Sequence, residues 1–267
     1  MSSDNPDITL GPLGGQWFYT RATKTYDLTR SAGSKVVRMA TSHGPSGTQI
    51  EIDPSRTALV IVDMQNFFLD KRCIDHPTGL AAVKPLLTSI KRARELGIEI
   101  IWLNWGLTDA DLASMPAGVL RGFANAHIAA AARSSGLGAD LGPGLGRTLV
   151  RGEPNTAIWP PLAAAVNGEH DVHCDKNRMS GMWTPSQPLY RHLEKSGKTC
   201  LLFAGVNSDE CVCGTLVDAY NAGWDCAILE DCCATTTPAG HEVLVYNVEN
   251  YYGFVVNSQT FAESKLL

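Results

Sequence analysis

The chain has 267 residues, 44% of them hydrophobic and 18% charged, which is enough apolar content to bury a sizeable core and excludes a disordered chain. Its net charge of −5 comes from 22 basic and 27 acidic residues without a basic run. Because a phosphate-binding surface needs clustered Lys and Arg, we expect no nucleic-acid partner. No apolar stretch is long enough to span a bilayer, and the N-terminal residues lack the pattern of a signal peptide. We therefore expect a cytoplasmic protein with no membrane association.

The N-terminal 50 residues are polar and rich in Gly, Ser and Thr, and they predict an N-terminal extension over residues 1–50. Within it, QWFYTRATKTYDLTR (residues 16–30) alternates bulky and polar side chains, as a hairpin does. We expect this hairpin to pack on the main domain, which is predicted to span residues 51–267.

A strand, a helix and a second strand are predicted next. TALVIVD (57–63) is a short apolar run that ends in an acid, which is typical of a strand covered on both faces. Residues 79–96 repeat apolar positions at helical spacing and stop at Gly97, a usual helix end. IEIIWLN (98–104) then predicts the next buried strand.

The composition changes over residues 106–170, where alanine-rich pieces and a glycine-rich segment (136–146) indicate connecting or lid-forming segments. After residue 184, helices and strands are predicted to alternate, with helices at 185–197, 211–223 and 238–250 and strands at 198–206, 225–232 and 251–257. Such alternation with short links predicts one α/β domain of three layers, α/β/α, around a mostly parallel sheet.

Ligands bind sheets of this type at the carboxyl ends of the strands. Asp63 ends the first predicted strand, and Cys211 follows the strand at 198–206 after a short turn, where it opens a predicted helix. Lys176 lies in a polar loop before a helix, with no strand predicted to position it. If the strands are neighbours, an acid, an amine and a thiol converge at one edge of the sheet.

Four interpretations of Cys211 are open: a buried small residue, a metal ligand, half of a disulfide, or a nucleophile. A helix start favours a thiolate, a carboxylate can take the thiol proton, and an ammonium can stabilise the anion. The combination with Asp63 and Lys176 therefore favours the nucleophile, although each residue alone has an ordinary structural explanation.

Eight cysteines without a secretory signal are typical of reduced thiols. Their spacing differs from the paired CxxC arrangement of structural zinc sites. The nearest approach to a metal-ligand cluster is a short polar run that contains His170, His173 and Cys174. One such run is weak evidence for a metal, so we expect no metal and no cofactor.

The three candidate residues, in this chain order, resemble the triad of the isochorismatase-like cysteine hydrolases. The matching pieces are TALVIVDMQNFF, DKNRMSGMW and AGVNSDECVCGTLVDAYNAGWDCAILEDCCAT, and the resemblance runs from about residue 55 to 260. It implies a Rossmann-like three-layer fold, a catalytic triad of Asp63, Lys176 and Cys211, and a homo-oligomer.

The resemblance also implies a cis peptide at Val206–Asn207 and an oxyanion bound by the N–H groups of Asn207 and Cys211. Asn207 and Ser208 stand where Ala or Thr is commoner in the family. Further candidates for substrate contact are Asn104, Trp105 and Trp183; their ordinary explanations are a strand end for the asparagine and core packing for the aromatic residues.

Family members with the full triad cleave C–N bonds of amides, ureides or carbamoyl compounds through a thioester, so we expect a small-molecule substrate of this kind. The segment LEDCCATTTPAGHEVLVYNVENYYGFVVNSQTF is most like ureidoacrylate amidohydrolases. The region after the second strand, NWGLTDADL, lacks the histidines of metal-dependent nicotinamidases. Hydrolysis of a vinyl ether such as isochorismate, a non-catalytic binding scaffold, and a redox or metal module remain as alternatives.

Overall fold

The computed structural model describes residues 7–30, 35–44, 47–129 and 136–267. Its main sheet has six strands in the order β11-β10-β9-β6-β7-β8, and every neighbouring pair is parallel. The strands are β6 (Thr57–Val62), β7 (Glu99–Trp105), β8 (Val172–Lys176), β9 (Cys200–Val206), β10 (Asp225–Ala234) and β11 (Phe254–Val256). The predicted parallel sheet is confirmed.

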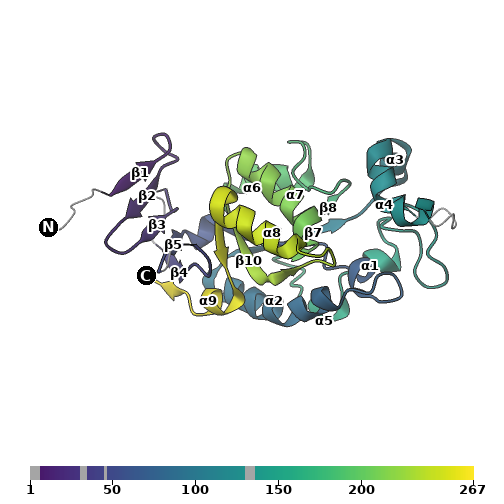
Figure 1. Cartoon of the computed structure of the whole chain (residues 1–267), viewed down its shortest axis with the longest axis horizontal. Coiled ribbons are helices and arrows are strands. Elements are labelled where there is room, and N and C mark those ends of the chain that lie inside the picture. Colours follow the sequence, from purple (N-terminus) through teal and green to yellow (C-terminus); the bar gives the residue numbers. More distant parts are fainter. Residues whose placement is uncertain (1–6, 31–34, 45–46, 130–135) are drawn as a thin grey trace.

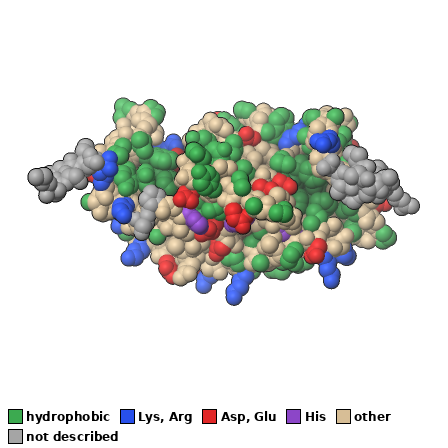
Figure 2. All heavy atoms as spheres, viewed as in Figure 1, with side chains coloured by type: hydrophobic (Ala, Val, Ile, Leu, Met, Phe, Trp, Pro, Cys, Tyr) green, Lys and Arg blue, Asp and Glu red, His purple; other side chains and the backbone are tan. Residues whose placement is uncertain are grey.

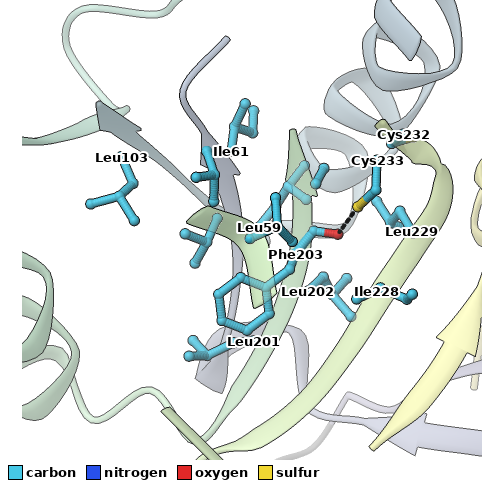
Figure 3. Close-up of a cluster of buried hydrophobic side chains, with 14 of the residues drawn as sticks. Leu59, Ile61, Leu103, Leu201, Leu202, Phe203, Ile228, Leu229, Cys232 and Cys233 are labelled. Atoms are coloured by element: carbon cyan, nitrogen blue, oxygen red, sulfur yellow. Dashed lines mark hydrogen bonds between the residues drawn. The ribbon is translucent and has the colours of Figure 1, made fainter. Parts of the chain in front are cut away.

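The central strands β6 and β9 are buried along their whole lengths. Their continuous apolar sequences suit a sheet that is covered on both faces. Figure 3 shows Leu59, Leu202 and Phe203 packed together in this core, where the thiol of Cys233 donates a hydrogen bond of 3.6 Å to the carbonyl of Phe203. The core therefore forms around the strands that carry Asp63 and Cys211 at their carboxyl ends.

Gly205 is required where β9 passes β6. Its φ is +119°, and a Cβ atom at this position would overlap the carbonyl oxygen of Val62. Any side chain would push apart the two strands that lead to the candidate catalytic residues.

Helices cover both faces, so the three-layer fold is confirmed. Figure 1 shows α6, α7 and α8 on one side of the sheet and α2, α5 and α9 on the other. The α-helices are α1 (Asn66–Leu69), α2 (Pro77–Leu96), α3 (Asp109–Ala113), α4 (Ala117–Ala129), α5 (Pro160–Ala163), α6 (Pro188–Ser196), α7 (Cys213–Asn221), α8 (Gly240–Asn247) and α9 (Ser258–Ala262). Short helical turns are the 3-10 turns η1 (Pro54–Arg56) and η2 (Pro154–Thr156) and the π-helical turns η3 (Ser208–Val212) and η4 (Val248–Tyr252).

Helix α2 has clear signals at both ends. Its N-cap is His76, whose Nδ1 accepts a hydrogen bond of 2.8 Å from the backbone N–H of Gly79, and Pro77 occupies the first helical position. At the other end Gly97 adopts the left-handed conformation, as predicted.

A second sheet lies beside the main one, at the left of Figure 1. Its strands, in the order β1-β2-β3-β5-β4-β12, are β1 (Ile8–Leu10), β2 (Trp17–Thr20), β3 (Thr25–Asp27), β5 (Gln49–Ile52), β4 (Val37–Ala40) and β12 (Lys265–Leu266). β2 and β3 pair antiparallel, so the predicted hairpin is present. The sheet takes its last strand from the far end of the sequence, and whether residues 1–50 form a unit distinct from residues 51–267 stays a prediction.

The second sheet docks on β10 and β11 through aromatic and charged contacts. The rings of Trp17 and Tyr26 lie 5.6 and 5.3 Å from the ring of Phe254. Asp225, at the start of β10, accepts hydrogen bonds from Trp17 Nε1 at 3.0 Å and from Arg30 at 2.8 Å. These contacts hold β2 and β3 against β10 and β11.

On the face shown in Figure 2, Lys and Arg side chains are scattered mainly around the outline, while acidic side chains lie near the middle. None of the helices in the described ranges combines the length and the apolar character that crossing a bilayer requires.

Candidate active site

Asp63 directly follows β6 and is fully buried. Its backbone has a φ of 52°, a left-handed conformation that is uncommon for a residue other than glycine. The backbone N–H of Trp105 donates a hydrogen bond of 3.1 Å to Oδ1, and the Asp63 N–H donates one of 2.8 Å to the carbonyl of Leu103. The end of the neighbouring strand β7 therefore fixes this carboxylate.

Lys176 is the last residue of the edge strand β8, so the prediction that it lies in a loop before a helix is wrong. Its side chain is buried, its Nζ lies 3.0 Å from Asp63 Oδ2, and the same Nζ is 3.9 Å from the ring centroid of Trp105. Lys176 Nζ and Asp63 Oδ2 form an ion pair, but their geometry is not that of a hydrogen bond. A buried ammonium is stable here because a carboxylate and an aromatic face surround it.

Cys211 lies in η3, the turn that leads from β9 into α7, and it is 2% exposed. The peptide bond Val206–Asn207 is cis, as the resemblance implies. The N–H groups of Glu210 and Val212 both donate hydrogen bonds of 3.1 Å to the carbonyl of Asn207, which winds the turn tightly. The thiol therefore sits in the first turn of the helical segment that follows the central strand β9.

The structure brings Asp63, Lys176 and Cys211 together. Lys176 Nζ donates a hydrogen bond of 3.4 Å to Cys211 Sγ, and the thiol faces the Asp63 carboxylate closely enough to lower the pKa of Asp63. All eight cysteines carry free thiols, so Cys211 is not half of a disulfide in this structure. Acid, amine and thiol meet at the carboxyl edge of the sheet, at the ends of β6, β8 and β9.

Burial has the largest effect on the pKa values of Asp63 and Cys211. It raises the pKa of the Cys211 thiol to about 12, against the lowering effect of Lys176. Burial also raises the pKa of Asp63 above its ordinary value, although Lys176, the thiol and the Trp105 N–H oppose it. The expectation that the helix start holds the sulfur ionised is therefore wrong, because burial favours the neutral thiol.

Gln65 is a buried residue of the site that the sequence did not single out. Its Oε1 accepts a hydrogen bond of 3.0 Å from the Trp105 N–H, and its Nε2 donates one of 2.8 Å to the Trp105 carbonyl. The side-chain amide of Gln65 thus binds both the N–H and the carbonyl of Trp105. These two bonds fix the end of β7 and keep the Trp105 ring against Lys176. In sequence it is an unremarkable polar residue two positions after Asp63.

A chain of hydrogen bonds fixes the side chain of Asn207. Because the Gly79 N–H donates to Nδ1 of His76, the ring proton is on Nε2, which donates a hydrogen bond of 2.7 Å to Asn207 Oδ1. Asn207 Nδ2 then donates a hydrogen bond of 3.3 Å to Glu210 Oε2. The asparagine that departs from the family pattern bridges the start of α2 and the residue before Cys211.

The other predicted substrate-contact residues are arranged differently. Trp105 is fully buried under Lys176 and makes an edge contact with Phe123, with ring centroids 5.0 Å apart. Asn104 is buried, and its Oδ1 has no hydrogen-bond partner within the described part of the chain. Trp183 is 46% exposed, and its Nε1 donates to Asn177 Oδ1 at 3.2 Å, so it lies on the loop after β8 rather than against the triad residues.

The polar run before Lys176 does not form a metal cluster. His170 is exposed in the turn before β8, and within the strand His173 is exposed whereas Cys174 is buried, because residues of a strand alternate between its faces. Across the residues that the structure describes, no three His, Cys, Asp or Glu side chains gather closely enough to hold a metal ion.

Residues 57–260 match a family model described as the isochorismatase domain. A cysteine hydrolase from Pseudomonas syringae pv. phaseolicola 1448A is 18% identical, with a TM-score of 0.64 over 79% of this chain and 93% of that chain. N-carbamoylsarcosine amidase from Thermoplasma acidophilum is 20% identical, with a TM-score of 0.55 over 76% and 96%.

Nicotinamidase from Bacillus subtilis is 18% identical to the chain, with a TM-score of 0.56 over 76% of this chain and 99% of that chain. These structural likenesses support the fold, and the family match covers all three residues of the acid–amine–thiol group. The resemblance drawn from the sequence is confirmed: the chain belongs to the isochorismatase family of hydrolases.

Proposed function

We propose that the protein is a cysteine hydrolase that cleaves a C–N bond of a small amide, ureide or carbamoyl compound through a thioester. The observation that carries this proposal is the buried contact of Lys176 Nζ with both Asp63 Oδ2 and Cys211 Sγ. Two structures with this fold are of enzymes named as amidases, N-carbamoylsarcosine amidase and a nicotinamidase. Homo-oligomer formation and a cytoplasmic location stay predictions.

The first half of the reaction forms the thioester. Asp63 accepts the thiol proton as the sulfur of Cys211 attacks the carbonyl carbon. This proton transfer is needed because burial favours the neutral form of the thiol in the free site. The negative charge that develops on the carbonyl oxygen is received by the N–H groups of Asn207 and Cys211, and Lys176 stabilises the sulfur anion. Asp63 then returns the proton to the departing nitrogen, and the C–N bond breaks.

The second half hydrolyses the thioester. Asp63 takes a proton from a water molecule that attacks the same carbonyl carbon, and the C–S bond breaks. The sulfur takes the proton back from Asp63, and the acid product leaves. Lys176 opposes the rise in the pKa of Asp63 and so keeps the buried carboxylate available as a base.

Product analysis tests the proposal. Incubation of the protein with a panel of small primary amides and ureides is expected to release ammonia or an amine and an equal amount of the acid. Mass spectrometry of a quenched reaction is expected to find an acyl group on Cys211. Release of pyruvate from isochorismate without amine release from any amide would favour the vinyl ether alternative. Absence of turnover with both classes would favour a binding scaffold.

The pH dependence offers a second test. An ordinary aspartate has a pKa of about 3.9, and burial raises the pKa of Asp63. Since the base must be ionised to accept the thiol proton, kcat/KM is expected to fall as the pH drops through this raised pKa, which lies above that of an ordinary aspartate. The measurement is a pH–rate profile with circular dichroism at each pH. A rate that stays constant down to about pH 4 with the fold intact would contradict the role of Asp63.

A further inference from the structure

Glu210 is the partly exposed residue directly before the nearly sealed Cys211. Its carboxylate position is fixed, because Oε2 accepts from Asn207 Nδ2 at 3.3 Å and Asn207 is itself tethered to His76 at 2.7 Å. His76 in turn caps α2. These linked hydrogen bonds hold the Glu210 carboxylate beside the nucleophile, whereas a glutamate on an ordinary surface is flexible.

The carboxylate of Glu210 is not held in a salt bridge within the described part of the chain. No Lys, Arg or His in the described ranges forms an ion pair with it. Lys176 is engaged with Asp63 and Cys211, and the ring nitrogens of His76 are engaged with Asn207 and Gly79. The guanidinium of Arg178, on the loop after β8, contacts Met115 Sδ and the Asn177 carbonyl. The Asp63–Lys176 pair is neutral overall, which leaves the site with the negative charge of Glu210.

The surroundings of Glu210 disfavour the charged form of its carboxyl group. Burial and the neighbouring carboxylates of Asp209 and Asp63 raise the pKa of Glu210, while the hydrogen bond from Asn207 and the nearby His76 oppose this. Because Glu210 directly precedes Cys211 and its carboxylate accepts from Asn207, it lies beside the nucleophile. A positive group on a substrate bound there would lower the energy of this half-buried carboxylate, and a second carboxylate would raise it.

We propose that Glu210 is a specificity residue that favours substrates carrying an ammonium or another strong N–H donor close to the scissile carbonyl and disfavours substrates carrying a carboxylate there. Asn207 and His76 act as positioning residues for it. The inference rests on the proposed C–N hydrolysis and adds a substrate class to it. A site of this kind differs from one built for ureidoacrylate, which is an anion.

Three primary amides of similar length separate the charge preference from other effects: 3-aminopropanamide is a cation, butanamide is neutral and succinamate is an anion. Wild-type protein is expected to show kcat/KM values, measured by ammonia release, at least about tenfold higher for the cation than for the anion. In Glu210→Gln, whose Oε1 still accepts from Asn207, the ratio of cation to anion is expected to fall at least about tenfold.

Asp209→Asn is the matched control, since it removes one negative charge from the same turn and leaves Glu210 in place. Its ratio of cation to anion is expected to stay within about threefold of the wild-type ratio, because the interaction weakens with distance. A wild-type preference for succinamate, an unchanged ratio in Glu210→Gln, or an equal change in Asp209→Asn would overturn the inference.

A binding measurement keeps the inference separate from the proposed function. The affinities of the Cys211→Ala protein for the same three amides, with and without the added Glu210→Gln substitution, report the charge preference without turnover. If no amide is hydrolysed by the wild-type protein, the proposed function fails. The loss of cation preference on adding Glu210→Gln then still supports Glu210 as a charge selector, and equal binding by the two proteins rejects it.

Discussion

Replacement of Cys211 by serine is expected to lower the turnover of any amide substrate at least about a thousandfold while the protein stays folded. A hydroxyl is a far weaker acid than a thiol, and the base beside it is a single carboxylate. The smaller side chain leaves Lys176 and Asp63 in contact and gives the new hydroxyl polar partners, so the fold is preserved. Ammonia release measures the turnover, and thermal unfolding measures the stability.

Cys213→Ser is the matched control for this substitution. Cys213 begins α7 two residues further on and is partly exposed, so its replacement is expected to leave turnover within about threefold of wild type. Mass spectrometry is expected to find the acyl group on the Cys213→Ser protein and not on the Cys211→Ser protein. More than a tenth of wild-type turnover in Cys211→Ser would exclude the nucleophile role.

Replacement of Lys176 by methionine is expected to destabilise the protein by about 3–5 kcal/mol and to abolish turnover. The substitution keeps the volume of the side chain but leaves Asp63, which is fully buried, without its ion partner. Breaking a buried pair is costly because one charge stays uncompensated in a low-dielectric surrounding. Urea unfolding measures the loss as a fall in the midpoint at an unchanged slope.

The double variant Asp63→Asn with Lys176→Met distinguishes the ion pair from general packing. Since it removes both charges, it is expected to recover at least about half of the lost stability without recovering turnover. Recovery of both would mean that the pair is structural and not catalytic. A stability loss in Lys176→Met below about 1 kcal/mol would mean that the charge reaches solvent or finds another partner.

The strands that carry Asp63 and Cys211 could be predicted because continuous apolar sequences are the direct signature of a sheet buried on both faces. The strand that carries Lys176 could not. β8 is VHCDK, with one branched apolar residue, and it is a strand because its backbone pairs with β7 at the edge of the sheet. Tertiary pairing here outweighs local preference.

The hydrogen-bond partners of the site were also beyond sequence reasoning. Gln65 and His76 act through backbone groups and side chains that lie far away along the chain, as in the contact of His76 with Asn207. No spacing rule links such positions. The state of the thiol was mispredicted for a related reason, because the helix start is visible in the sequence whereas the burial that raises the pKa of Cys211 depends on the whole fold.

The pairing of β12 with β4 has a consequence for how the protein is made. Lys265 and Leu266 lie opposite Arg38 and Val37, and the Leu267 N–H donates to the Val36 carbonyl. During translation, residues 37–40 leave the ribosome before β12 is made, so this edge of the second sheet stays open until β12 pairs with it. A chain in which β12 is missing or unpaired therefore exposes the backbone of β4 to association with another chain.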